Sequence, residues 1–210
     1  MTIAALRRGG DGGGRLGSHV PGRTPWYKAA ASTVCPMPID HVARMQPFHI
    51  WQNAFTPAEL DSIEAMGDRL SYVYGVLSDG PALPDYGLRV TRQAIMAPEP
   101  ETAWLYQRLE RVMRVLNQQT YQFDLMGFAE PFAFMTYDAA EGGHLSWHVD
   151  DGPQMPSPRK LSATLQLSDG GTYEGGDLVI FPSFVLHRVT PMTSGVRKAL
   201  VIWSTGPYFR

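Results

Sequence analysis

Two histidine-containing segments in the C-terminal half carry side chains that could hold a metal ion. His148 and Asp150 are two positions apart, so on a β-strand they share one face, while Trp147 and Val149 share the other. An imidazole from a neighbouring strand, for which His187 is the natural candidate, would complete a set of two histidines and one carboxylate. Such a set leaves several positions of an octahedral ion open and suits Fe(II), whereas zinc prefers a closed tetrahedron.

Other metal chemistries fit the sequence less well. His144 and His148 are four residues apart, but the residues between them lack the glutamate of the helical zinc-protease motif, and Gly142 and Gly143 disfavour a helix. The single cysteine, Cys35, excludes an internal disulfide and a cysteine-rich cluster. A His-x-Asp tripeptide also arises by chance, and a lone strand histidine is more often a surface or hydrogen-bonded core residue. The sequence around His187 must therefore show whether these residues form a metal site.

That context resembles a known enzyme family. The run Phe181–Pro191 contains His187, and Gly195-Val196-Arg197 and then Trp203 follow it. Together with the His-x-Asp pair, this arrangement resembles the Fe(II)- and 2-oxoglutarate-dependent dioxygenase superfamily, and most of all its prolyl 4-hydroxylase-like branch. The resemblance extends over about residues 48–210, and its specific part lies between Pro131 and Trp203.

The resemblance implies roles for individual residues. It places the iron ligands, and hence the catalytic site, on His148, Asp150 and His187, and it places the group that binds the far carboxylate of 2-oxoglutarate on Arg197. A guanidinium suits that task because it can form two parallel, charge-assisted hydrogen bonds with a carboxylate. Arg188 is the alternative, but it adjoins His187 on the chain and should face away from the metal in a regular strand.

Three further cofactor-binding residues follow from the resemblance. Tyr137 matches the tyrosine whose hydroxyl contacts the cosubstrate, and the alternative is a packed aromatic residue. Thr164 and Gln166 belong to an alternating polar row that lines the cosubstrate pocket in the family, whereas such a row faces water in an ordinary sandwich. Trp203 resembles the family's tryptophan after the arginine, and we expect it to pack.

The implied activity is hydroxylation of an unactivated carbon coupled to oxidation of 2-oxoglutarate to succinate and CO2. The cofactors would be Fe(II), 2-oxoglutarate, O2 and, as an accessory reductant, ascorbate. The acceptor would be a peptide or protein side chain, an amino acid or a small metabolite, and turn-rich segments at residues 79–81, 84–86 and 151–159 could form the rim of its site. Two alternatives stay open: a noncatalytic jelly-roll binding or assembly module that has lost turnover, and a cupin-like metal-binding protein that does not use 2-oxoglutarate.

The elements that must position these residues form an α+β, mainly β pattern. Thr56-Pro57-Ala58-Glu59 predicts a helix start with a capping box, and an apolar stripe predicts a second helix over about 101–119. Strands are expected at 131–137, 145–149, 160–167, 178–184 and 198–204. The resemblance implies a double-stranded β-helix, or jelly roll, with the N-terminal helices packed on the larger sheet.

One departure from the family concerns the segment between Asp150 and His187, which is short because residues 174–178 lead almost directly into residues 179–182. We expect the smaller sheet to lack a hairpin. The strand edge left bare would need cover from the N-terminal tail, from a loop or from a second subunit, so a homodimer through that edge is one expectation.

Composition limits the classes of protein. The 210 residues carry a formal charge of −2 and contain no apolar run long enough to cross a bilayer. These features argue against nucleic acid and membranes as partners and favour a cytoplasmic protein. Residues 1–46 are rich in glycine and proline and predict a disordered tail, which leaves one domain over residues 47–210.

Overall fold

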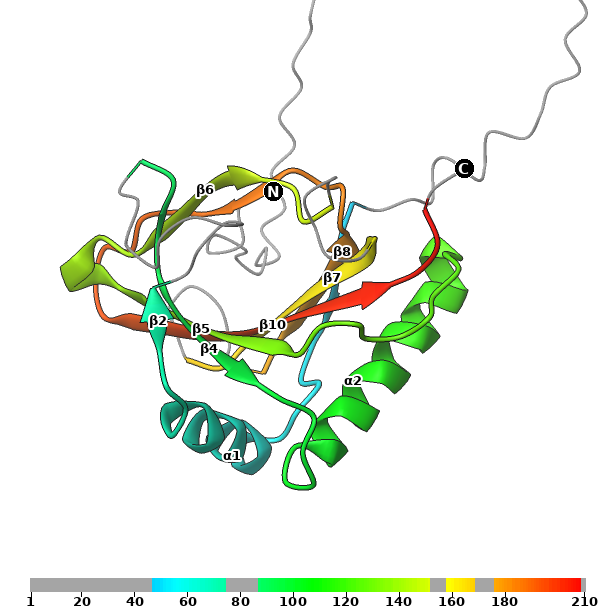
Figure 1. Cartoon of the computed structure of the whole chain (residues 1–210), viewed down its shortest axis with the longest axis horizontal. Coiled ribbons are helices and arrows are strands. Elements are labelled where there is room, and N and C mark those ends of the chain that lie inside the picture. The colour runs from blue at the N-terminus through cyan, green and yellow to red at the C-terminus, as the bar shows by residue number, and fades with distance from the viewer. Residues whose placement is uncertain (1–46, 75–86, 152–157, 169–175, 209–210) are drawn as a thin grey trace, which may run out of the picture.

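The computed structural model describes residues 47–74, 87–151, 158–168 and 176–208, which form two β-sheets and two α-helices (Figure 1). The strands of the large sheet are β1 (His49–Trp51), β2 (Val73–Tyr74), β4 (Arg92–Met96), β5 (Phe132–Asp138), β7 (Arg159–Gln166), β8 (Leu178–Pro182) and β10 (Val196–Thr205). Their order is β1-β8-β7-β10-β5-β4-β2. The small sheet has the order β3-β6-β9 and consists of β3 (Arg89–Val90), β6 (His144–His148) and β9 (His187–Val189).

The first helix, α1 (Pro57–Asp68), begins where the sequence predicts. The Thr56 hydroxyl accepts from the backbone N–H of Glu59 at 3.3 Å, and the Glu59 carboxylate accepts from the backbone N–H of Thr56 at 2.8 Å. This reciprocal capping box satisfies two N–H groups that a helix start otherwise leaves without partners. The second helix, α2 (Ala103–Leu116), continues into a π-helical turn at Asn117–Tyr121, so the helical segment ends close to the predicted position.

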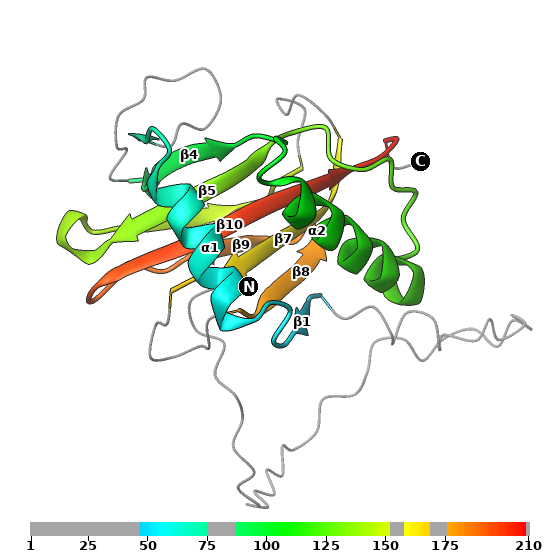
Figure 2. The ribbon, with the colours of Figure 1, turned by 90° about the horizontal axis from the view of Figure 1, so that it is seen from below.

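Both helices cover the same face of the large sheet, as Figure 2 shows from below. The main core forms there from side chains of α1 and α2, such as Ile63 and Leu109, packed against Phe134, Leu165 and Leu200 of the sheet. The opposite face of the large sheet carries Ala133, Met135 and Tyr137, which pack against Leu145 and Val189 of the small sheet. One face of the large sheet thus holds the main core, and the other faces the strands with the candidate ligands.

Four short strands lie outside the predicted order of helices first and strands afterwards. β1 precedes α1, while β2, β3 and β4 lie between the two helices. Their two to five residues are too few for a clear alternating pattern, and pairing with longer strands holds them in place. The five predicted strands correspond to β5, β6, β7, β8 and β10 within a few residues.

The link between β7 and β8 is where the sequence predicts that the small sheet lacks a hairpin. The two strands pair directly as antiparallel neighbours, and the described residues between them, 167–168 and 176–177, form no strand. Residues 1–46, most of the predicted rim segments and the centre of this link lie outside the described residues. No helix within the described ranges is long and apolar enough to cross a membrane.

Candidate metal centre

The two candidate ligand histidines lie directly opposite each other on paired strands. β6 and β9 are antiparallel, His148 is the register partner of His187, and their ring centroids are 4.1 Å apart. Asp150 lies just beyond the end of β6, where its backbone N–H donates to the Ser183 carbonyl oxygen at 2.8 Å. One ligand atom from each of the three residues lies within 4.8 Å of the others, so the structure brings the predicted triad together.

Backbone carbonyls orient both imidazoles. The Nδ1 atom of His148 lies 2.9 Å from the Ser146 oxygen, and that of His187 lies 2.9 Å from the Val185 oxygen. Since a carbonyl oxygen can only accept, Nδ1 must carry the proton in each ring, which leaves the Nε2 lone pair of the neutral imidazole free. These Nε2 atoms lie 3.6 Å from Oδ1 and Oδ2 of Asp150, respectively, so the two nitrogens and the carboxylate converge as a set of metal ligands requires.

The electrostatics also favour a bound cation. Asp150 is 6% exposed. Burial alone would raise the pKa of Asp150, but its contacts with His148, His187 and the Ser162 hydroxyl together lower it to about 2. Burial lowers the pKa of His187 more than the neighbouring Asp150 raises it. An ionised carboxylate and neutral imidazoles are the protonation states that bind a divalent metal.

Two serines lie in a hydrogen-bonded row that ends at the carboxylate, and the sequence did not single them out as site residues. The Ser162 hydroxyl donates to Oδ2 of Asp150 at 2.6 Å and lies 3.0 Å from the Ser183 hydroxyl. Ser162 belongs to the alternating polar row of β7, and Ser183 follows β8. The row could be recognised in the sequence, but its contact with Asp150 depends on how the two sheets face each other.

Arg197 lies on the face of the large sheet that looks toward the small sheet, directly opposite Tyr137. Its side chain is 2% exposed, and Nε and Nη2 donate to Oε1 of Gln166 at 3.1 and 2.9 Å. Within the described ranges the hydrogen bonds of this guanidinium go to Gln166, and Nε2 of Gln166 is buried with no hydrogen-bond partner. A buried positive charge whose hydrogen bonds go to a neutral amide oxygen, and which otherwise faces the Tyr137 ring, fits an anchor for an incoming carboxylate.

The other predicted contacts lie on the same inner face. Tyr137 is buried with its ring 5.1 Å from the Arg197 guanidinium carbon, and Thr164 is buried on the strand that carries Gln166. Trp203 packs against the inner cluster, as expected. Arg188, the alternative anchor, instead lies 4.7 Å over the ring of Trp147, away from His187.

A second buried guanidinium was missed in the sequence. Arg89 on β3 is 6% exposed, and its Nη2 lies 3.3 Å from Oε1 of Gln93 and 3.8 Å from Sδ of Met135. Burial lowers the pKa of Arg89, while Tyr137 and Asp150 act to raise it, so its charge is felt at the site. A two-residue strand has no period that could mark such a side chain in advance.

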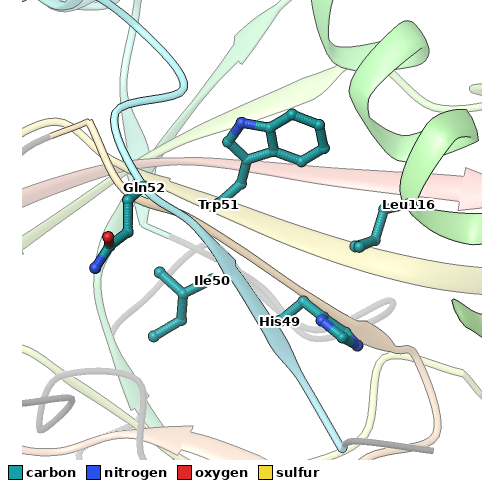
Figure 3. A pocket seen from close by; sticks show the side chains of 5 residues that line it. All are labelled: His49, Ile50, Trp51, Gln52 and Leu116. Carbon is teal, nitrogen blue, oxygen red and sulfur yellow. The ribbon is translucent and has the colours of Figure 1, made fainter. Parts of the chain in front are cut away.

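A separate open pocket of about 360 Å³ lies at the edge of the large sheet (Figure 3). His49 and Trp51 of β1 point toward Leu116 of α2, while Ile50 and Gln52 point the other way. None of the triad residues lines it. The ligand chemistry therefore lies between the two sheets and not in this pocket.

Comparison with known proteins identifies the part of the chain that carries the site. Residues 132–205 match the family model of the 2OG-Fe(II) oxygenase superfamily. A PKHD-type hydroxylase of Pseudomonas putida (strain W619) is 36% identical over 88 residues, and one of Teredinibacter turnerae is 41% identical over 85 residues. Each match covers 30% of this chain, and the matched segments span 39% and 38% of those relatives.

Solved structures share the fold over a longer stretch. A Pseudomonas putida prolyl-4-hydroxylase has a TM-score of 0.59 at 17% identity and covers 81% of this chain and 97% of its own. A prolyl hydroxylase from Trichoplax adhaerens, solved in complex with a peptide fragment of the hypoxia inducible factor oxygen degradation domain, has a TM-score of 0.62 at 13% identity and covers 80% of this chain and 86% of its own. Residues 132–205 thus carry a segment similar to the 2OG-Fe(II) oxygenase superfamily and to PKHD-type hydroxylases, within a fold that is similar to that of prolyl hydroxylases.

Proposed function

We propose that this protein is an Fe(II)- and 2-oxoglutarate-dependent hydroxylase built on a jelly-roll domain. The observation that carries the proposal is the convergence of His148, Asp150 and His187 opposite a sheet face that holds the buried Arg197. Two neutral imidazoles and a carboxylate can hold Fe(II) from one side and leave positions free for other ligands. A guanidinium between the sheets can then anchor a dicarboxylate that reaches toward those positions.

In this proposal the side chains divide the work. His148, Asp150 and His187 hold the metal, Arg197 binds the far carboxylate of 2-oxoglutarate, and Tyr137 lies beside that carboxylate. Thr164 and Gln166 form the polar wall of the same pocket. O2 would be the oxidant, and the bound metal would couple the oxidation of 2-oxoglutarate to that of the acceptor: 2-oxoglutarate, O2 and a C–H group of the acceptor would yield succinate, CO2 and a C–OH group. The protein holds the metal, the cosubstrate and the acceptor in position, and it keeps water from the buried site.

The acceptor we propose is a carbon of a peptide or protein side chain, with a free amino acid or small metabolite as the other outcomes. Support comes from the solved relative in complex with a peptide fragment and from the prolyl-4-hydroxylase of Pseudomonas putida, which share this fold. Ascorbate would act as an accessory reductant. Incubation with proline-containing peptides and with free amino acids, read by mass spectrometry as a gain of one oxygen atom, distinguishes these acceptors.

Spectroscopy under anaerobic conditions tests the site before any acceptor is known. Addition of Fe(II) and 2-oxoglutarate should give a weak visible charge-transfer band, which should vanish in His148→Ala and weaken in Arg197→Ala. Arg188→Ala is the matched control, because Arg188 faces Trp147 on the outside and should leave the band unchanged. Absence of the band in the wild type would favour a noncatalytic binding module, which the direct pairing of β7 with β8 also permits.

A further inference from the structure

The Asp150 carboxylate has a different environment at each of its two oxygens. Oδ2 accepts the Ser162 hydroxyl at 2.6 Å, whereas Oδ1 lies 3.6 Å from Nε2 of His148, a nitrogen that carries no proton in the neutral ring. Each oxygen faces one candidate ligand nitrogen, since Oδ2 lies 3.6 Å from Nε2 of His187, but within the described ranges only Oδ2 accepts a hydroxyl. The asymmetry lies within the side chain of a candidate ligand and is set by a residue of the opposite sheet.

The donor is itself fixed by its surroundings. Ser162 and Ser183 are both 0% exposed, and their hydroxyl oxygens lie 3.0 Å apart. Because the Ser162 proton is engaged by Asp150, the Ser183 hydroxyl must donate to the Ser162 oxygen. The chain therefore runs from Ser183 through Ser162 to the carboxylate, and a donor that accepts a hydrogen bond in turn is a stronger donor.

The backbone holds the same three residues in register. The carbonyl oxygen of Ser183 accepts from the N–H of Asp150 at 2.8 Å, and the N–H of Ser183 donates to the carbonyl of Lys160 at 3.0 Å. Ser162 lies on β7, a strand whose residues are all buried. The hydroxyl thus sits on a rigid strand and not on a loop, so its position relative to Asp150 is fixed before any metal arrives.

We infer that Ser162 is a positioning residue that makes Asp150 a one-oxygen metal ligand, with Oδ2 held by the hydroxyl and Oδ1 presented to the metal. The inference rests on the proposed iron site. A carboxylate that bound through both oxygens would use a second position of an octahedral ion. By holding Oδ2, Ser162 keeps that position open for the two donor atoms of the keto acid. Ser183 supports the same arrangement one step further from the metal.

Binding of Co(II) to the full-length protein tests this without turnover. Removal of a partner in the second coordination sphere weakens metal binding by about 10–100-fold, so Ser162→Ala should raise the Co(II) dissociation constant by about that factor in calorimetric titration. The visible spectrum of bound Co(II), which reports its coordination, should change as well. Ser162→Thr restores the hydroxyl and should restore both readouts, and Ser183→Ala should give a smaller loss than Ser162→Ala.

The control is Ser204→Ala, which removes another buried serine hydroxyl, one that donates to the Gly127 carbonyl away from the triad. It should bind Co(II) as the wild type does. Equal affinity and an unchanged spectrum in Ser162→Ala would overturn the inference and leave the iron site intact, whereas a wild type that binds no Co(II) would overturn both. If Ser162→Ala does not fold, Ser183→Ala tests the inference instead. Unchanged Co(II) binding in Ser183→Ala would contradict the hydrogen-bond chain.

Discussion

Arg197 combines a permanent charge with almost complete burial, and its value as an anchor depends on its shape as well as its charge. Its two bonds to Gln166 Oε1 show that Nε and Nη2 can bind one group side by side. In Arg197→Lys the charge remains but the paired geometry is lost, and in Arg197→Met both are lost. We expect the dissociation constant of 2-oxoglutarate, measured anaerobically with Mn(II), to rise about tenfold in the lysine variant and about 100-fold in the methionine variant, since hydrogen bonds to charged groups contribute about 1.5–3 kcal/mol.

Arg188→Met serves as the control for this series, because it removes an arginine that contacts Trp147 on the outer side. Mn(II) binding in the absence of 2-oxoglutarate should stay the same in all three variants. Equal 2-oxoglutarate affinity in Arg197→Met and the wild type would show that another group, such as the nearby Arg89, anchors the dicarboxylate.

His187 couples stability to pH in the metal-free protein. Burial lowers the pKa of His187 below its ordinary value of 6.5, so between these two pKa values the unfolded chain binds a proton that the folded chain does not. The stability that this group contributes is therefore present above about pH 6.5 and is lost as the pH falls through the folded-state pKa. Urea unfolding of chelator-treated protein at pH 7.5, 6.5 and 5.5 should show this loss in the wild type and a flatter dependence in His187→Gln. His144→Gln is the control, since His144 lies outside the triad, and an equally steep dependence in His187→Gln would contradict the assignment.

At the level of elements, α1 packs closely against the large sheet at a glycine. A Cβ atom built on Gly67 would lie 2.1 Å from Cε2 of Phe134, a ring that is fully buried in β5. Alanine favours a helix over glycine by about 1 kcal/mol, but overpacking a core costs about 1–3 kcal/mol, and here the rigid ring cannot move aside. Gly67→Ala should therefore lower the free energy of unfolding in urea. Ser62→Ala, at an exposed position of the same helix, should leave it unchanged or raise it slightly, and a stabilised Gly67→Ala would show that the helix can shift.

The same elements show how far the sequence could be interpreted in advance. The start of α1 was predicted because Thr56 and Glu59 satisfy each other's backbone locally, and long strands such as β5 and β10 were predicted because they are rich in aliphatic, aromatic and hydroxylated residues between turn-forming ones. β3 was not, because two residues carry no period, and Arg89 was missed with it. His148 and Asp150 were paired by their spacing along a strand, whereas the roles of His187 and Arg197 were assigned through the resemblance to the family. The role of Ser162 could not be predicted, since its contact with Asp150 crosses from one sheet to the other.

For the molecule as a whole, the metal centre and the main core occupy opposite faces of the large sheet. The helix-covered cluster, which includes Ile63, Leu109 and Phe134, contains none of the triad residues, and the small sheet packs through Leu145 and Val189. The fold should therefore persist without metal, unlike that of a zinc finger, whose folding depends on its ion. Circular dichroism of chelator-treated protein should retain its signal and a cooperative melt.

Metal binding should then add stability by mass action alone. At a Mn(II) or Co(II) concentration of 100 times the dissociation constant the gain is about 2.7 kcal/mol, which corresponds to a rise in Tm of about 5–10 °C for a protein of this size. The rise should be absent in His148→Ala and in His187→Ala and should persist in Ser62→Ala, which lies on the helix side of the molecule. If removal of the metal instead abolished the cooperative melt, the triad would hold the two sheets together, and the separation between core and site would be wrong. Because the two faces share only the strands between them, we expect the metal to stabilise a structure that the core has already formed.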